Sequence, residues 1–388
     1  MSISRGIATF TLDNGKCPRW LFDRMVRLGR EMIEIIAVEI GPDEFIKRIA
    51  DPVWFQSLGT VLAFDWNASG LTTVLTAALK EAIRGEERNL GIFICGGKGK
   101  TSLKTPEQIK FWSEKENLSL ALSDNLVYSS KMSAKVDSAL VQDGYQLYHH
   151  TFFFSRTGSW AVVQQGMNEQ NGTARRYHWF SDEKTRPDFN FVCEPHYGII
   201  SDIKTLPLNL VAQKSEPTRD CGVDLVGKNS FNELMKDVFL LEKYASRLNQ
   251  MARLKVDDRQ LTLLNLEPVE YKYHPVIKEN FRASRYLQNI LWKLCDEKPE
   301  EYEKILATQG VGAKTMRALA LIAEVIYGAK PSYEDPARYG FALGGKDGTP
   351  YFVDRPTYDA TIELLRRYVN KMKIDISEKN KILSRLKN

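Results

Sequence analysis

Cysteine is scarce in this chain and follows no metal-binding or disulfide pattern. The 388 residues contain five cysteines, spread from Cys17 to Cys295 without a C-x-x-C pair. This spacing excludes a zinc ribbon and a small disulfide framework. It is typical of a protein kept in a reducing compartment.

Long apolar runs are also missing. The chain has no stretch of about 18 consecutive apolar residues, and no apolar segment follows a basic start near Met1. We therefore expect a cytoplasmic protein without a membrane span or secretion signal. The net charge of +5 and the pI near 8.7 permit a phosphate-rich partner without requiring one.

The length favours two domains, because 388 residues exceed what one compact core usually serves. We expect an α+β catalytic domain over residues 1–215 and an all-α DNA-binding domain over 216–388. In the first domain, aromatic and β-branched runs predict a three-stranded antiparallel meander. Its expected strands cover residues 145–154, 160–167 and 174–180.

Periodic apolar positions predict the helices on both sides of this meander. Before it, helices are expected over 20–40, in a further stretch through 55, over 72–82, from 105 onward and over 125–139. Residues 203–224 are expected to form a loop-rich boundary, and the tail after 376 to fray. Beyond the boundary, helices are expected over 231–253, 282–294, 300–308, 313–327 and 358–372, with a glycine-rich loop over 333–355.

The stretch Gly91-Ile-Phe-Ile-Cys-Gly-Gly-Lys-Gly-Lys-Thr-Ser102 resembles a nucleotide-binding loop, but its spacing is wrong. A Walker loop needs a glycine five residues before Gly99, and Ile94 stands there. Exposed backbone N–H groups, with Lys98 and Lys100, would still suit an anion such as a DNA phosphate. The alternative is a flexible basic turn.

Residues 305–321 resemble a helix–hairpin–helix DNA-binding element, which we place at about 300–328. Gly310 and Gly312 permit a tight turn around Val311, and the second helix then begins with N–H groups that suit a phosphate. Lys314 and Thr315 would add a charge and a hydroxyl. Such a contact reads the DNA backbone rather than the bases. The alternative is an ordinary helical corner.

Polar residues gather in the meander. Four of the five histidines lie between His149 and His196, beside Gln164-Gln165 and Arg175-Arg176. Because neighbours in a strand face opposite sides, one face should collect a histidine, a glutamine and an arginine. The alternative is a polar outer face with no chemical role.

This cluster suits phosphodiester chemistry. We predict that Arg175 and Arg176 hold the scissile phosphate and that His149 or His178 acts as general acid or base. We predict that Gln164, Gln165 and Lys135 also take part in catalysis. Asp143 and Asp137 are the predicted ligands of a Mg²⁺ or Mn²⁺ ion.

Several strings resemble the domain-of-unknown-function family 763 of archaea and bacteria. They include Gly96-Gly-Lys-Gly-Lys100, Ala134-Lys-Val-Asp137, Gln142-Asp-Gly144, Tyr148-His-His150, Val163-Gln-Gln-Gly-Met167, Ala174-Arg-Arg-Tyr-His-Trp179, Gly310-Val-Gly312, Asp335-Pro-Ala-Arg338 and Gly344-Gly-Lys-Asp-Gly348. The resemblance implies DNA processing by a homo-oligomer, expected to be a dimer. Asn67 stands where we expect histidine in relatives.

We therefore expect a metal-dependent, structure-specific nuclease acting on branched or partly single-stranded DNA in repair or recombination. One alternative is a helix–hairpin–helix DNA glycosylase, in which Lys314 and Asp335 would do the chemistry. Two others are a non-catalytic protein that binds structured DNA and an RNA-processing enzyme.

Overall fold

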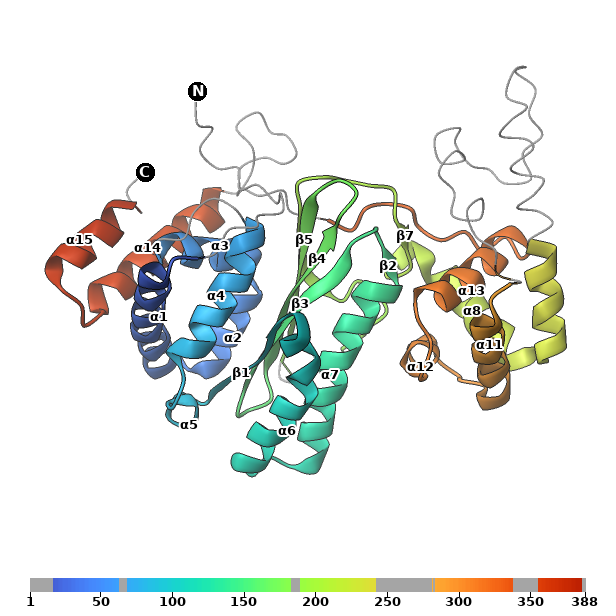
Figure 1. The fold of residues 1–388 in the computed structure, drawn as a ribbon, viewed down its shortest axis with the longest axis horizontal. Coiled ribbons are helices and arrows are strands. Elements are labelled where there is room, and N and C mark those ends of the chain that lie inside the picture. The colour runs from blue at the N-terminus through green and yellow to red at the C-terminus, as the bar shows by residue number, and fades with distance from the viewer. Residues whose placement is uncertain are drawn as a thin grey trace, which may run out of the picture.

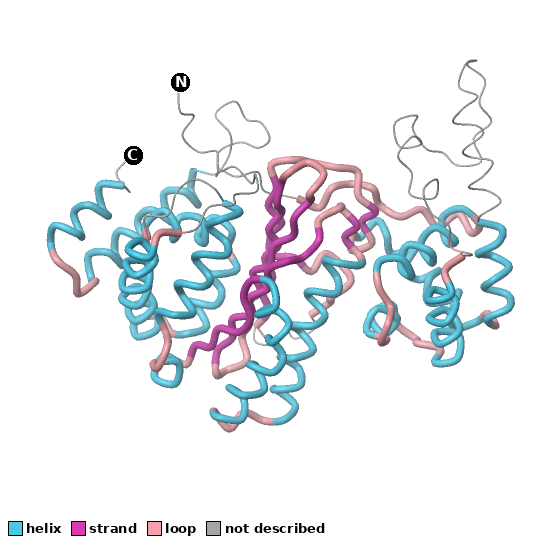
Figure 2. Tube along the Cα trace, in the orientation of Figure 1, coloured by secondary structure: helices cyan, strands magenta, loops and turns pink. Residues whose placement is uncertain are grey.

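A five-stranded antiparallel sheet lies at the centre of the computed structural model, between two layers of helices (Figure 1, Figure 2). The structure describes residues 17–62, 68–182, 189–241, 281, 283–337 and 355–385. The strand order is β1-β3-β4-β5-β6. These strands are β1 (Ile92–Lys98), β3 (Gln146–Ser155), β4 (Trp160–Asn168), β5 (Thr173–Ser181) and β6 (His196–Ser201).

The predicted meander is confirmed as β3, β4 and β5, and β1 and β6 extend it on its two edges. A separate two-stranded sheet pairs β2 (Val141–Gln142) with β7 (Leu208–Asn209). Helices cover both faces of the large sheet. Phe152 and Phe154 therefore point into one apolar core, whereas Phe153 points into the other.

The first helical layer packs on the face that receives Phe153. It contains α1 (Arg19–Glu39), α2 (Pro42–Ala50), α3 (Pro52–Val61) and α4 (Ala68–Ala82), followed by the short α5 (Glu87–Leu90). The predicted stretch through residue 55 is two helices, because Asp51 caps α3 and Pro52 occupies its first position. The Asp51 carboxylate accepts hydrogen bonds from the N–H groups of Val53 and Trp54.

The opposite face is covered by α7 (Leu120–Ala139), with α6 (Thr105–Lys115) beside it after the 3₁₀ segment η1 (Gly99–Lys104). Beyond α7, a group of C-terminal helices lies further from the sheet (Figure 1). It contains α8 (Glu216–Lys228) after η2 (Gln213–Ser215), then residues 231–241, α11 (Arg285–Glu297), α12 (Tyr302–Ala307) and α13 (Ala313–Val325).

In this region, one predicted loop is partly helical and one predicted helix runs past the described residues. Part of the predicted loop over 203–224 is helix α8, which begins at Glu216 with Pro217 in its first turn. The helix predicted over 231–253 continues to residue 241, and its remainder lies outside the described residues. Residues 338–354 of the predicted glycine-rich loop also lie outside them.

The last two helices, α14 (Arg355–Lys371) and α15 (Ile376–Arg385), return to α1. Leu365 and Val369 join the apolar core built by α1 to α4. Arg27 on α1 also pairs with Glu378 on α15 at 2.9 Å. The segment predicted to fray is therefore an ordered helix up to Arg385. In the described part of the chain, no helix has the length and apolar character needed to cross a membrane.

Candidate functional site

The polar residues of the central strands point alternately to the two faces of the sheet, as their alternation predicts. Both faces are covered by helices, so all of these side chains are buried, with at most 7% exposed. The expected grouping of a histidine, a glutamine and an arginine occurs on both faces, and each face is covered by helices. The α7-facing set is His150, Gln164 and Arg175, and the α4-facing set is His149, Gln165, Arg176 and His178.

On the α7-facing side, Asp137 collects three hydrogen bonds. Its carboxylate accepts from the Gln164 amide on β4, the Trp179 indole N–H on β5 and the His196 imidazole on β6. The carboxylate is 1% exposed, and these donors satisfy a group whose burial would otherwise be costly. One residue of α7 thus fixes side chains on three strands.

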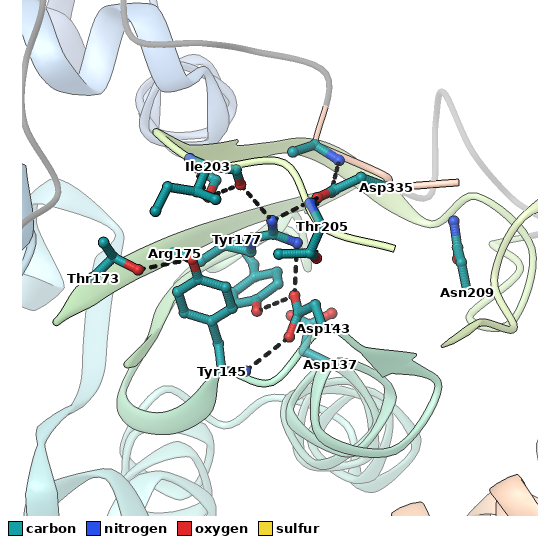
Figure 3. Close-up of polar contacts among 12 residues, drawn as sticks. Asp137, Asp143, Tyr145, Thr173, Arg175, Tyr177, Ile203, Thr205, Asn209 and Asp335 are labelled. Carbon is teal, nitrogen blue, oxygen red and sulfur yellow. Dashed lines mark hydrogen bonds and ion pairs between the residues drawn. The ribbon is translucent and has the colours of Figure 1, made fainter. Parts of the chain in front are cut away.

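A second buried carboxylate, Asp143, lies beside Arg175 (Figure 3). The guanidinium of Arg175 donates to Asp143 at 2.9 Å and to Asp335 at 2.8 Å. The Tyr177 hydroxyl also donates to Asp143, at 2.7 Å. Burial acts to lower the pKa of Arg175, but Asp143, Tyr177 and Asp335 outweigh it and the pKa is raised. Arg175 is thus a buried, permanently charged bridge.

This bridge joins the sheet to the segment that follows α13. The Asp335 carboxylate also accepts from the backbone N–H of Thr205 at 2.7 Å. Arg175 is fully buried, and its guanidinium is paired with two carboxylates. It is therefore not accessible to a phosphate group of a ligand. Asp335, the residue expected to carry the chemistry of a glycosylase, is likewise held by internal partners.

On the α4-facing side, the two histidines predicted as general acid or base are held neutral. Burial lowers the pKa of His149 to about 3, with further contributions from His150 and Lys98. Burial also lowers the pKa of His178 well below its usual value, with Arg176 adding to the effect. Neither side chain is protonated near pH 7, so neither is ready to act as an acid there.

The neighbours of these histidines are hydroxyl and aromatic groups. The imidazole Nε2 of His149 lies 3.1 Å from the hydroxyl of Thr76 on α4. The His178 ring packs edge-on against Phe55 on α3, at 5.4 Å between ring centroids. Arg176 lies over the same Phe55 ring at 4.7 Å, and burial lowers its pKa to about 9. The set is packed as part of the core.

His196 is the one histidine of this region that combines an internal partner with access to a cavity. The cavity has a volume of about 170 Å³ and lies between β6, β7 and residues 332–336. Its walls include His196, Glu194, Asn209, Glu334 and Asp335. Glu194 has a backbone φ of +42°, an unusual conformation for a residue other than glycine.

Sequence reasoning placed His196 in the histidine cluster but assigned it no role. Its partner Asp137 was predicted only as a metal ligand. The two residues are 59 positions apart, and only the packing of β6 against α7 brings them together. A carboxylate behind an imidazole that opens into a cavity is the arrangement of a general acid or base.

The predicted metal ligands Asp137 and Asp143 are both occupied by internal donors. Among the residues that the structure describes, no three histidine, cysteine or acidic side chains are grouped to hold a metal ion. Mg²⁺ commonly binds through one or two carboxylates together with water and substrate phosphates. Glu194 and Glu334 are carboxylates on the cavity wall, and Glu334 pairs with Lys214 at 2.6 Å.

The predicted hairpin lies between α12 and α13. Gly310 has a φ of +94°, and a Cβ there would lie 2.5 Å from the Cδ1 of Ile290. Gly312 has extended backbone and precedes α13 without any side-chain cap. Lys314 is half-buried in the first turn of α13. The carbonyl of Ala313, the first residue of α13, accepts a hydrogen bond from the Gln142 side chain at 2.9 Å.

Other predicted residues lie in less expected places around this hairpin. Val311 is 4% exposed, and Thr315 is 2% exposed, so the Thr315 hydroxyl does not reach the surface. Lys135 on α7 donates to the carbonyl of Thr308 at 2.9 Å. Lys135 therefore belongs beside the hairpin and not beside the buried histidines.

In the stretch 91–102, Gly96 is required by close packing. Gly96 lies within β1, where a Cβ would come 2.3 Å from the carbonyl oxygen of His150. Its N–H donates to the Gln108 side chain at 2.9 Å and is not available to an anion. Lys98 and Lys100 are exposed where β1 passes into η1, and the Lys98 ammonium lies 5.8 Å from the Tyr148 ring centroid.

These features define an α+β protein with an antiparallel sheet and a group of C-terminal helices. The chain belongs to the family described as "Protein of unknown function (DUF763)", whose model matches residues 6–353. The resemblance found in the sequence is thereby confirmed. No curated protein and no solved structure matches the chain.

Proposed function

We propose that the protein is a DNA-processing phosphodiesterase that acts on branched or partly single-stranded DNA. The observation that carries the proposal is the hydrogen bond between Asp137 and His196 at the wall of a cavity. The opposite wall of this cavity includes residues 332–336, which follow α13. The chain thus runs from α13, the helix that would bind DNA, to the cavity in which DNA would be cleaved.

The α12–α13 hairpin is the DNA-binding element of this proposal. At the turn from Gly310 to Gly312, the N–H groups and the helix dipole at the start of α13 would favour a phosphate. The same helix leads, through residues 326–331, to the cavity wall at residues 332–336.

In the cavity, His196 would take a proton from the attacking water or give one to the leaving oxygen. Because Asp137 is bonded to Nε2, Nδ1 is the nitrogen that would exchange the proton with the substrate. A Mg²⁺ or Mn²⁺ ion remains part of the proposal and would neutralise charge on the phosphate. Glu194 and Glu334 line the cavity and would be the carboxylate ligands, with water and the DNA supplying the rest. Glu334 would then exchange its partner Lys214, at 2.6 Å, for the ion.

The test is cleavage of fork, bubble and flap DNA by the purified protein, with and without Mn²⁺. We expect His196→Gln to lose at least about 100-fold in rate, the usual contribution of a general acid or base. Tyr197→Phe is the matched control, because Tyr197 is the next residue on β6 and packs against the opposite core. Equal rates for His196→Gln and the parent protein would overturn the assignment of His196.

A protein that only binds DNA would show salt-dependent affinity for the same substrates but no product. A matched RNA competitor would distinguish DNA from RNA processing, since the two differ in the 2′-hydroxyl. The phosphodiesterase is favoured over the glycosylase because Asp335 accepts hydrogen bonds from Arg175 and Thr205. These donors occupy the carboxylate that a glycosylase would use.

A further inference from the structure

Tyr286 on α11 is an exposed aromatic residue that lies against the hairpin. Its side chain is 62% exposed, while its hydroxyl donates to the carbonyl of Gly310 at 2.7 Å. A tyrosine ring held at its phenolic end keeps a fixed position at little further entropic cost. The ring is thus fixed beside the turn with much of its surface in water.

The neighbours of Tyr286 on α11 also face the hairpin. Lys293 follows seven residues later, which is two helical turns and the same side of the helix. The Lys293 ammonium lies 3.5 Å from the carbonyl of Gln309. Between them, Ile290 closes the space behind Gly310. One side of α11 therefore presents a ring, an apolar contact and a cation to the turn.

Basic side chains from other helices reach the same turn. Lys135 on α7 donates to the carbonyl of Thr308 at 2.9 Å. Lys314 lies in the first turn of α13. Together with Lys293, Lys135 and Lys314 bring three positive charges to the turn, and Glu297 on α11 pairs with Lys293 at 3.5 Å. Arg317, one turn further along α13, instead donates to the Gln142 side chain at 2.5 Å.

An exposed ring among basic side chains is what single-stranded nucleic acids bind, because the cations meet phosphates while the ring stacks on a base. In a duplex the base faces are covered by their neighbours, so only an unpaired base can stack on a side chain. We infer that Tyr286 stacks on an unpaired base beside the phosphate held at the hairpin. The inference rests on the proposed function and gives it a substrate class: a junction between duplex and single strand.

The experiment compares binding of the full chain to a blunt duplex and to the same duplex with a single-stranded tail, at one salt concentration. We expect the parent protein to bind the tailed DNA more tightly. Tyr286→Ala should lower affinity for tailed DNA by about tenfold and leave the blunt duplex unchanged. A 2-aminopurine at the first unpaired position should change fluorescence with the parent protein but not with Tyr286→Ala.

Two variants separate stacking from a structural role. Tyr286→Phe removes the hydrogen bond to Gly310 but keeps the ring, so it should retain the preference for tailed DNA. Trp292→Ala removes another exposed ring of α11, 56% exposed and about 120° around the helix from Tyr286. It should change neither affinity. Thermal unfolding of each variant shows whether the fold is kept.

The inference is overturned if Tyr286→Ala keeps the full preference, or if Tyr286→Phe loses as much as Tyr286→Ala. It is also overturned if the parent protein binds both DNAs equally, although DNA binding itself would then stand. If the parent protein binds neither DNA, the proposed function fails as well.

Discussion

The imidazole of His196 on β6 is hydrogen-bonded to the buried carboxylate of Asp137 on α7. The same carboxylate accepts from Gln164 and Trp179, so its position is fixed from three strands. In the proposed mechanism, this carboxylate would position the imidazole and stabilise the charge that develops on it during proton transfer.

Asp137→Asn is therefore expected to lower the rate of DNA cleavage without weakening DNA binding. The amide keeps the shape of the side chain but does not stabilise an imidazolium, so we expect a loss of about 10- to 100-fold, smaller than that of His196→Gln. Rates at saturating DNA and binding by anisotropy measure the two effects. A variant that cleaves like the parent protein would show that Asp137 serves packing alone.

Replacing Arg175 should strongly destabilise the protein. Arg175→Met would leave the Asp143 and Asp335 carboxylates without their cation, and breaking a buried ion pair costs about 3–5 kcal/mol. Arg156→Ala is the control, since Arg156 pairs with Glu116 at 2.5 Å but is 50% exposed. Its expected cost is at most about 1 kcal/mol. Urea unfolding of both variants compares the two, and equal costs would contradict the prediction.

Stability should fall in mild acid because of the buried neutral histidines. In the unfolded chain His149 takes up a proton near its usual pKa of about 6.5. In the folded protein it does so only at about pH 3. Between these values the unfolded state binds more protons, so the free energy of unfolding decreases as pH falls. His178 acts in the same direction.

The expected slope is up to about 1.4 kcal/mol per pH unit for each such histidine. Urea unfolding at about pH 7, 6 and 5 measures it. His149→Gln removes one of the titrating groups and should make the dependence shallower, whatever its effect on stability at pH 7. An unchanged slope in this variant would mean that His149 does not titrate as described.

The two glycines of the hairpin should respond differently to alanine. Gly310→Ala places a Cβ 2.5 Å from Ile290 at a φ of +94°, so we expect a loss of about 1–3 kcal/mol. Gly312 has extended backbone and nothing within 4 Å of the added Cβ. Gly312→Ala should change stability by less than about 1 kcal/mol. Thermal or urea unfolding measures the free energy of unfolding of both variants. A larger loss for Gly312→Ala than for Gly310→Ala would contradict the prediction that Gly310 is the more constrained glycine.

The three strands of the meander and most helices could be predicted from the sequence, because their periods and end signals are local, whereas β2, β6 and β7 were not predicted. The meander over residues 145–180 is an example: aromatic and β-branched runs alternate with clear turns. Two helix boundaries were missed for local reasons as well. Pro52 divides one expected helix, and Pro217 begins α8 inside an expected loop.

Burial could not be predicted in the same way. Alternation correctly separated His149 from His150, but it does not tell whether helices cover one face of a sheet or both. The outer strands of the predicted meander, β3 and β5, pair with β1 and β6, and an apolar core covers each face of the sheet. The side chains predicted to form the site lie in the core, whereas His196 meets Asp137 through a contact that no local pattern contains.

The return of α14 and α15 to α1 has a consequence for how this chain can be divided. A fragment ending near residue 215 would lack Leu365, Tyr368, Val369 and Met372, which fill the core beneath the first helices. The helices that carry the hairpin are thus inserted between two parts of one unit. Removing them requires two cuts and a rejoined chain, and a single truncation would leave apolar surface exposed to water.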